Sequence, residues 1–101
     1  MDIITEPPRQ IPVAAEVDLC VAGGSATGVF AAVRAARLGL RVALVEHQNR
    51  LGGTATGGLV NVWHSLHDCH GRQQVIGGLT VEVEERLQAR DAVAIRPPSD
   101  A

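Results

Sequence analysis

The pattern of apolar and polar positions is most regular between residues 17 and 46 of the 101-residue chain. Val17 to Ala22 is a short apolar run, and Arg41 to Val45 is a second run that ends in Glu46. Between these runs, the stretch from Thr27 to Leu38 places its apolar residues at helical spacing. The pattern predicts a strand, a glycine turn, a helix and a second strand. Unbroken apolar strands are typical of a parallel sheet covered on both faces, and the helical connection between them is right-handed.

The predicted helix has faces of different character. One face is apolar, with Val29, Val33 and Ala36, and another is basic, with Arg34 and Arg37. Gly39 suits the end of the helix, because glycine adopts the left-handed conformation at which many helices stop. Arg37 suits the last turn, where the helix dipole favours a positive charge.

The residues between the first run and the helix have the composition of a phosphate-binding turn, Gly23-Gly24-Ser25-Ala26-Thr27-Gly28. Gly23 lets the chain leave the strand in a tight turn. The amides of the first helical turn then point at one place, where the positive helix end favours a phosphate. Gly28 lacks bulk and lets helix and sheet pack closely, as do the alanines after it, Ala31, Ala32 and Ala35. Glu46, at the carboxyl end of the second strand, is placed to accept hydrogen bonds from a ribose diol.

Together these features form the fingerprint of a dinucleotide-binding domain of the α/β class, a Rossmann-like βαβ unit. One position departs from the pattern, because Ser25 stands where the second glycine of G-x-G-x-x-G is usual. The serine Cβ costs room near a pyrophosphate, whereas the hydroxyl can hydrogen-bond a phosphate oxygen. The alternative is an ordinary strand, turn and helix without a ligand, and the spacing of turn, helix, strand and acid argues against it.

The rest of the chain divides into a lead-in and a less regular second half. Residues 1–15 contain Pro7, Pro8 and Pro12, and we expect an extended lead-in there. Residues 16–101 are expected to form the N-terminal part of a dinucleotide-binding domain. A complete domain of this kind has more parallel strands than the two convincing ones here, so an incomplete domain of a larger enzyme is the expectation.

Weaker patterns follow the second strand. They predict a second glycine-rich loop, a strand or short helix, a turn, a returning hairpin strand and a helix, over residues 51–58, 59–63, 67–71, 73–76 and 79–90. Gly78 or Thr80 is expected to cap the last helix. Its apolar positions are Leu79, Val83 and Leu87, and its acidic ones, expected on a solvated face, are Glu82, Glu84 and Glu85.

Composition narrows the choice of partners and location. A net charge of −2 gives no basic surface for nucleic acid, and no apolar run approaches the roughly 20 residues of a membrane-spanning helix. The start, MDIITEPPRQ, lacks the basic and apolar regions of a secretory signal. Cys20, in a strand expected to be buried, and Cys69, in a polar loop, do not suggest a disulfide framework. A cytoplasmic protein is the resulting expectation.

The second glycine loop makes the chain similar to a particular family. The runs DLCVAGGSATGVFAAVRAARLGLRVALVE and LGGTATGGLVN resemble the N-terminus of the bacterial FAD-dependent oxidoreductases, relatives of succinate dehydrogenase and of the glutathione-reductase-like flavoproteins. The resemblance covers roughly residues 16–90. It implies FAD as the cofactor and a small-molecule substrate.

The resemblance also implies roles for particular residues. Those expected at the pyrophosphate are Gly23, Ser25, Ala26 and Gly28; Glu46 is expected at the adenosine ribose, and Arg50, Gly53 and Thr54 along the middle of FAD. With their neighbours, the expected cofactor-binding residues are Gly23, Gly24, Ser25, Ala26, Thr27, Gly28, Glu46, Arg50, Gly52, Gly53 and Thr54. The glutathione-reductase-like branch has a cysteine pair where Ala55 and Val60 stand here, which excludes a dithiol active site. The sequence identifies no catalytic residue and no covalent flavin ligand.

A histidine-rich segment invites a metal interpretation. His64, His67 and His70 surround Asp68 and Cys69, but their spacing fits no common zinc site. A polar hairpin turn without metal is the preferred interpretation, and a flavin-facing or substrate-facing role for His64 or His67 stays open.

Two further functional readings stay open at this stage. The enzyme alternative is an NAD(P)-dependent dehydrogenase or reductase, and the other is a truncated binding fragment without turnover. The sequence carries no signal for oligomeric state.

Overall fold

The computed structural model describes residues 1–94, and the end of the predicted 16–101 domain, residues 95–101, lies outside them. The chain forms two compact units, Met1–Gly53 and Thr54–Ala101, which are described separately. The predicted domain 16–101 spans both units, and its boundaries stay a prediction. None of the helices in the described part of the chain is long and apolar enough to cross a membrane.

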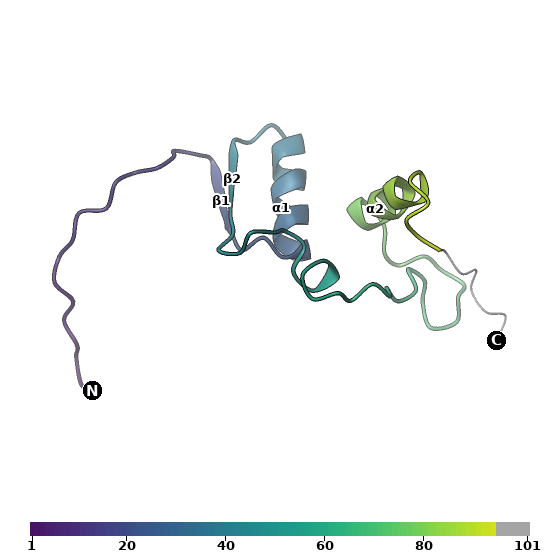
Figure 1. Cartoon of the computed structure of the whole chain (residues 1–101), viewed down its shortest axis with the longest axis horizontal. Helices are drawn as coiled ribbons and strands as arrows, with labels where there is room; N and C mark the ends of the chain where they lie inside the picture. Colours follow the sequence, from purple (N-terminus) through teal and green to yellow (C-terminus); the bar gives the residue numbers. More distant parts are fainter. Residues whose placement is uncertain (95–101) are drawn as a thin grey trace. The chain divides into compact units, whose positions relative to one another are not determined.

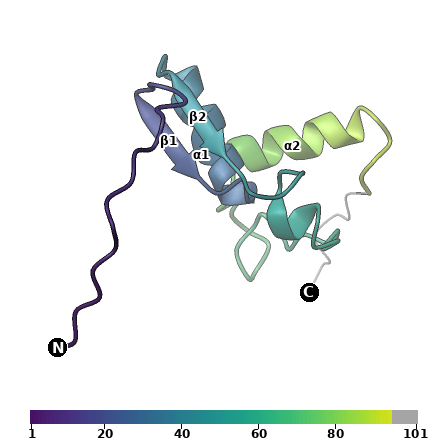
Figure 2. The same cartoon turned by 60° about the vertical axis from the view of Figure 1, so that its left-hand side comes forward.

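The first unit contains the predicted βαβ arrangement. Strand β1 covers Leu19–Ala22, helix α1 covers Ala26–Arg37 and strand β2 covers Val42–Val45. The two strands pair in parallel, from Leu19 opposite Val42 to Ala22 opposite Val45. Figures 1 and 2 show α1 running alongside the two strands. The α/β class and the parallel pairing are therefore confirmed.

Helix α1 begins and ends for local reasons. Ser25 is its N-cap, and the Ser25 side chain accepts a hydrogen bond from the backbone amide of Gly28. Arg34 and Arg37 lie in the last turn, where they complement the helix dipole. Gly39 follows with a φ of +90°, a conformation that favours glycine, so the predicted stop is confirmed.

The face of α1 that packs most closely is the one with the smallest side chains. Gly28, Ala32 and Ala35 are buried, and the two alanines are each 8% exposed. The close packing expected at Gly28, Ala32 and Ala35 is confirmed. On the apolar face predicted at Val29, Val33 and Ala36, the two valines are half-buried and Ala36 is exposed. Ala31 is also exposed. Small residues occupy the buried face because they let the helix axis approach the sheet, whereas the bulkier Val29 and Val33 are only half-buried.

One face of the sheet is left open by the described residues. Cys20 and Val45 lie on this face, because Cys20 pairs with Ala43 and Val45 with Ala22; Val45 is 57% exposed and Cys20 is an exposed free thiol. The prediction of strands covered on both faces, with Cys20 buried, is therefore wrong for the part of the chain that the structure describes. The reason is that α1 covers one face only, and a crossover helix always lies on one side of the strands that it joins.

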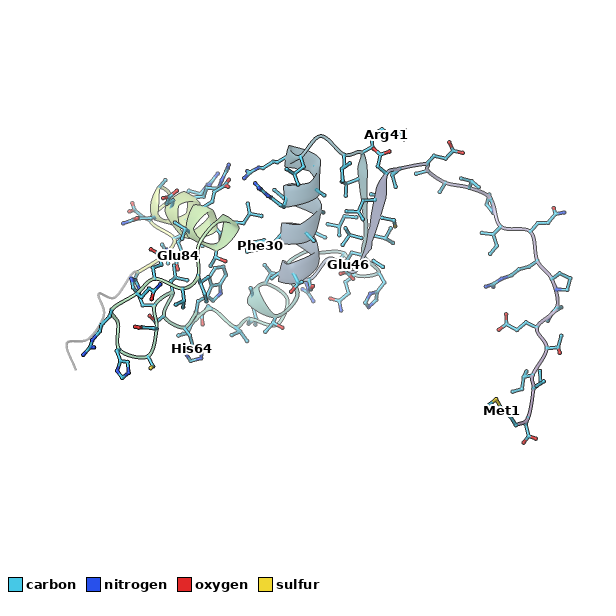
Figure 3. All side chains as sticks on the ribbon, turned by 180° about the vertical axis from the view of Figure 1, so that it is seen from behind. Met1, Phe30, Arg41, Glu46, His64 and Glu84 are labelled. Atoms are coloured by element: carbon cyan, nitrogen blue, oxygen red, sulfur yellow. The ribbon has the colours of Figure 1, made fainter. Side chains whose placement is uncertain are left out.

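An ion pair joins the residues that precede the two strands, at the end of the strand pair opposite the start of α1 (Figure 3). Asp18 precedes β1 and Arg41 precedes β2, and Nη2 of Arg41 lies 3.0 Å from Oδ1 of Asp18. The Arg41 backbone amide also donates to Oδ2 of Asp18 at 2.8 Å. These contacts, first by the Arg41 side chain and then by its amide, hold the pKa of Asp18 below its usual value of 3.8. Residues 1–17, which precede them, form no helix or strand.

The second unit is less regular. Helix α2 covers Leu79–Gln88, with Gly78 at its N-cap without a side-chain hydrogen bond. It therefore ends two positions earlier than predicted, and Gly78 rather than Thr80 caps it. Of its acidic residues, Glu85 is exposed as expected, whereas Glu82 and Glu84 are half-buried. Glu82 accepts a hydrogen bond from Nε of Arg86 at 2.9 Å.

The segments before α2 are mostly turns. A short 3-10 helix, η1, covers Gly53–Ala55. Residues 59–63 form neither the strand nor the helix predicted for them. The turn at 67–71 is confirmed, with the Gly71 amide donating to the Asp68 carbonyl at 3.0 Å. The returning strand at 73–76 is reduced to a single antiparallel bridge between His67 and Gln74.

Candidate functional site

Two glycine loops meet at the start of α1. The Gly52 amide donates to the Gly24 carbonyl at 2.8 Å, and Ser25 and Gly52 form an isolated parallel bridge. Gly53 lies so close that a Cβ on it would be 3.3 Å from the Cα of Ser25. Segments that are 28 positions apart in the chain thus share one small surface at the end of the sheet.

The first loop needs glycine for two different reasons. Gly23 has a φ of +106°, which favours glycine and allows the sharp exit from β1. Gly24 has no such φ, but it is buried, and a Cβ there would lie 2.5 Å from Cδ2 of Leu51 and 3.0 Å from the side chain of Glu46. The missing side chain at Gly24 therefore makes room for the Leu51 side chain.

Gly28 brings the first turn of α1 against the preceding loop. A Cβ on Gly28 would overlap the carbonyl oxygen of Gly23, which belongs to the backbone. The Gly28 amide donates to Oγ of Ser25 at 3.3 Å, and the Val29 amide donates to the Ser25 carbonyl at 2.9 Å. Ser25 thus takes the role of a helix cap, a role that the glycine-pattern argument did not anticipate.

The remaining amides of this turn are available to a ligand. The first amides of a helix have no partner within the helix. Within residues 1–94, the amides of Ala26 and Thr27 have no hydrogen-bond partner given by the structure. Both belong to the first turn of a 12-residue helix without an acidic residue in that turn. The local field there favours an anion such as a phosphate.

Glu46 connects the second strand to the first glycine loop. Its Oε2 accepts from the Gly24 amide at 2.7 Å, and its Oε1 accepts from the Gln48 amide at 3.0 Å. Nδ1 of His47 lies 2.9 Å from the same Oε1. Hydrogen bonds from the Gln48 and Gly24 amides, in that order, hold the pKa of Glu46 below its usual value of 4.5. Figure 3 shows Glu46 at the end of the strands nearest the start of α1, with Arg41 at the opposite end.

The structure brings together most of the predicted site, but not all of it. The loop contacts above join Gly24, Ser25, Gly28, Glu46, Gly52 and Gly53. Arg50 is exposed in the bend after Glu46. Thr54 belongs to the second unit, where its carbonyl accepts from the Val60 amide at 3.1 Å. That any of these residues contacts a cofactor stays a prediction.

Three contributors to this site are not among the predicted residues. Leu51 covers Gly24, and the amide of Gln48 and the imidazole of His47 contact the Glu46 carboxylate. The position of Leu51 next to the second glycine pair was a weak signal. Neither His47 nor Gln48 stands in a recognisable motif, so no sequence signal points to either residue.

The histidine-rich segment forms a polar hairpin turn. Oδ1 of Asp68 accepts from the Arg72 amide at 2.8 Å, and this bond lowers the pKa of Asp68. Within residues 1–94, no group of three or more His, Cys, Asp or Glu side chains is arranged to hold a metal ion. The absence of a metal from the protein stays a prediction. His64 is exposed, and His67 is half-buried in the hairpin.

Comparison with known proteins extends this geometry. The family model described as FAD dependent oxidoreductase matches residues 18–100. A mitochondrial dihydrolipoyl dehydrogenase of Schizosaccharomyces pombe is 36% identical over 87 residues, which cover 75% of this chain and 17% of the relative. A dihydrolipoyl dehydrogenase of Trypanosoma brucei brucei is 33% identical over 95 residues, covering 82% of this chain and 20% of the relative. No solved structure matches the chain significantly.

The match runs through both glycine loops, the acid after β2 and helix α2. The chain spans about a fifth of the length of the curated relatives that it matches. The description of the family names FAD, which indicates FAD as the cofactor. The chain belongs to the family of FAD-dependent oxidoreductases.

Proposed function

We propose that residues 17–53 form the part of an FAD site that holds the adenosine diphosphate. The observation that carries this proposal is the meeting of two glycine loops at the start of α1, with the Glu46 carboxylate beside them. Each part has the chemistry that a dinucleotide needs, because the helix start attracts phosphate and the carboxylate accepts from ribose hydroxyls.

The pyrophosphate lies at the amides of Ala26 and Thr27 in this proposal. Both amides begin a helix whose axis dipole is positive at that end. Gly23 adds no side chain to the turn before these amides, and nothing lies within 4 Å of where its Cβ would be. The hydroxyl of Ser25 remains able to donate its proton to a phosphate oxygen while its oxygen caps the helix. The site therefore fits a phosphate without a basic side chain.

The adenosine ribose lies at Glu46, and the middle of FAD runs toward the second loop. The close packing of Gly52 and Gly53 on Gly24 and Ser25 supports this direction, because it removes side chains along the line between the loops. Arg50 and Thr54 are assigned to this middle part by the family resemblance alone.

The natural protein that contains this sequence is proposed to be an FAD-dependent oxidoreductase acting on a small molecule. FAD, when bound, supplies the acceptor and donor of electrons, and the protein binds and orients it. The residues described here bind and position the cofactor rather than transfer protons. A cytoplasmic location and a bacterial source are part of the proposal; the two free cysteines, Cys20 and Cys69, support the first, and the family resemblance supports the second.

We do not propose for this chain the dihydrolipoyl compound that the names of the two relatives contain. Ala55 ends η1 and Val60 lies in the irregular segment that follows. Neither an alanine nor a valine side chain carries a thiol. The two cysteines of the sequence, Cys20 and Cys69, lie in different compact units and are both exposed free thiols. We therefore propose that electrons pass between FAD and the substrate without a cysteine pair at 55 and 60.

Absorption spectroscopy and titration test the cofactor. The natural protein should be purified with flavin absorption in the visible range, and its apo-form should bind FAD tightly, NAD weakly and NADPH negligibly. The 2′-phosphate of NADPH would place a like charge next to Glu46. Tight NADPH binding together with a failure to bind FAD would refute the proposal.

A further inference from the structure

The Glu46 side chain is more shielded from solvent than its place in the chain suggests. It follows the last residue of β2, and residues 47–50 of the bend after it are all exposed. Acidic side chains in such bends are ordinarily solvated, yet only 15% of the Glu46 side chain is exposed. The shielding therefore requires a neighbouring group besides the exposed bend.

Leu51 supplies an apolar group at this place. A Cβ on Gly24 would lie 2.5 Å from Cδ2 of Leu51 and 3.0 Å from both Cβ and Oε2 of Glu46. The end of the leucine side chain and these two Glu46 atoms thus surround one point, the space that the missing side chain of Gly24 leaves. Gly24 itself is buried there. The leucine methyl group therefore fills a space beside the carboxylate that water would otherwise occupy.

Backbone contacts determine where the Leu51 side chain lies. The Gly52 amide donates to the Gly24 carbonyl at 2.8 Å, and Gly52 pairs with Ser25 in a parallel bridge. Gly52 has a φ of +99°, which favours glycine and allows the chain to turn directly after Leu51. The second glycine loop thus reaches the acid at the end of β2 through the side chain of Leu51.

We infer that Leu51 is a positioning residue for the adenosine part of FAD, because its side chain fills the space left by Gly24 and holds the Glu46 carboxylate in place. The inference rests on the proposed function of Glu46. The Gly24 amide fixes Oε2 at 2.7 Å, and Leu51 limits rotation of the rest of the side chain. A carboxylate that is already held loses little conformational freedom when a ribose diol binds, so the ribose binds more tightly than it would to a mobile one.

The test is titration of the apo-form of the natural protein with ADP and with FAD. Leu51→Ala removes the atoms that reach the space beside Gly24, and we expect about three- to tenfold weaker binding of both compounds, in line with the ordering cost of one side chain. Leu51→Met keeps a long apolar side chain and should restore affinity to within about twofold of the wild type. Leu51→Val shortens the side chain and should lose less affinity than the alanine variant.

Leu40→Ala is the matched control. Leu40 is 45% exposed and Leu51 is 48% exposed, and Leu40 precedes Arg41 at the opposite end of the strands (Figure 3). The control removes the same side chain at similar exposure, away from Glu46, and should leave the binding of both compounds unchanged. Urea unfolding checks that each variant is folded. Should Leu51→Ala unfold, the milder Leu51→Val decides the question by the same titrations.

A double variant separates positioning from a general structural effect. In protein that already carries Glu46→Ala, adding Leu51→Ala should weaken ADP binding by less than about twofold, because no carboxylate remains to be held. A leucine that acts on the nucleotide directly, or on the fold as a whole, would instead cause the same loss with and without Glu46.

The outcomes separate this inference from the proposed function. Affinity in Leu51→Ala equal to that of the wild type would overturn the role of Leu51, and so would a full loss that persists in the Glu46→Ala background. Weaker binding of FAD with unchanged binding of ADP would also overturn it, since Leu51 would then act on the middle of the cofactor. Wild-type protein that binds neither compound would refute the proposed function itself.

Discussion

Replacing Gly28 by alanine should destabilise the first unit because the added methyl group meets backbone. A Cβ at this position would overlap the carbonyl oxygen of Gly23, and that carbonyl belongs to the turn that positions both β1 and α1. Overpacking typically costs about 1–3 kcal/mol. Alanine regains up to about 1 kcal/mol over glycine through its higher helix propensity. Because the added methyl group meets a backbone atom, the upper part of the overpacking range applies, about 2–3 kcal/mol, and the expected net loss is about 1–2 kcal/mol of unfolding free energy.

Two other glycines provide the comparison. At Gly24 the nearest atom to an added Cβ is the end of the Leu51 side chain, which is 48% exposed and can rotate away. Gly24→Ala should therefore cost less than about 1 kcal/mol, since flexible neighbours relieve overpacking. At Gly77 nothing lies within 4 Å and no unusual φ occurs, so Gly77→Ala should change stability by no more than about 0.5 kcal/mol.

Urea unfolding of the three variants of the natural protein, followed by far-ultraviolet circular dichroism, checks this order. With a slope of about 2 kcal/mol per molar urea, Gly28→Ala should lower the midpoint by about 0.5–1 M. FAD affinity should fall in the same variant, because the amides of Ala26 and Thr27 move with the helix. A midpoint for Gly28→Ala equal to that for Gly77→Ala would show that the contact with Gly23 is not rigid, and would refute the reasoning.

Further predictions concern the cap, the acids and the core. Ser25→Ala should lose about 1 kcal/mol of stability because the helix cap is missing, Ser25→Gly should lose only a few tenths, and Ser25→Val should in addition block the approach to the pyrophosphate. Equal stability and equal FAD affinity in all three variants would contradict this prediction. Glu46→Gln should weaken FAD binding about tenfold or more, measured by fluorescence titration, because a charged acceptor is lost. Asp18 has a lowered pKa, so its contribution to stability is present above about pH 4 and is lost as pH falls through the folded value; Asp18→Asn should flatten acid unfolding curves in that range, and unchanged curves would exclude the role of Arg41. Ala32 and Ala35 are the only buried apolar residues among residues 1–94, so the 101-residue chain alone should unfold broadly on heating, and a sharp reversible transition would count against this.

The local elements of the first unit were predictable from sequence because short-range physics decides them. The apolar runs before Gly23 and before Glu46 have strand length, and the helix between them has its stop signal at Gly39. The predicted C-terminal ends of the two strands, Ala22 and Val45, are confirmed, and the other predicted bounds differ from those observed by one or two residues. The irregular segment 59–63 and the reduced strand at 73–76 were not predictable, because short apolar runs outside a periodic pattern do not distinguish strand from loop.

Only the tertiary structure shows which contacts the predicted site residues make. Spacing identified Glu46 as an acid at the end of a strand, but only the fold shows that its carboxylate accepts a hydrogen bond from the Gly24 amide. The sequence places glycines at positions 24 and 28. Only the packing shows that a Cβ on Gly24 would meet the Leu51 side chain, whereas a Cβ on Gly28 would meet the backbone carbonyl of Gly23. The physical reason is that propensity and periodicity act within a few residues, whereas the contacts of Gly24 with Glu46 and Leu51 join segments more than 20 residues apart. The contact of Gly28 with the Gly23 carbonyl depends on how closely α1 packs against the turn before it.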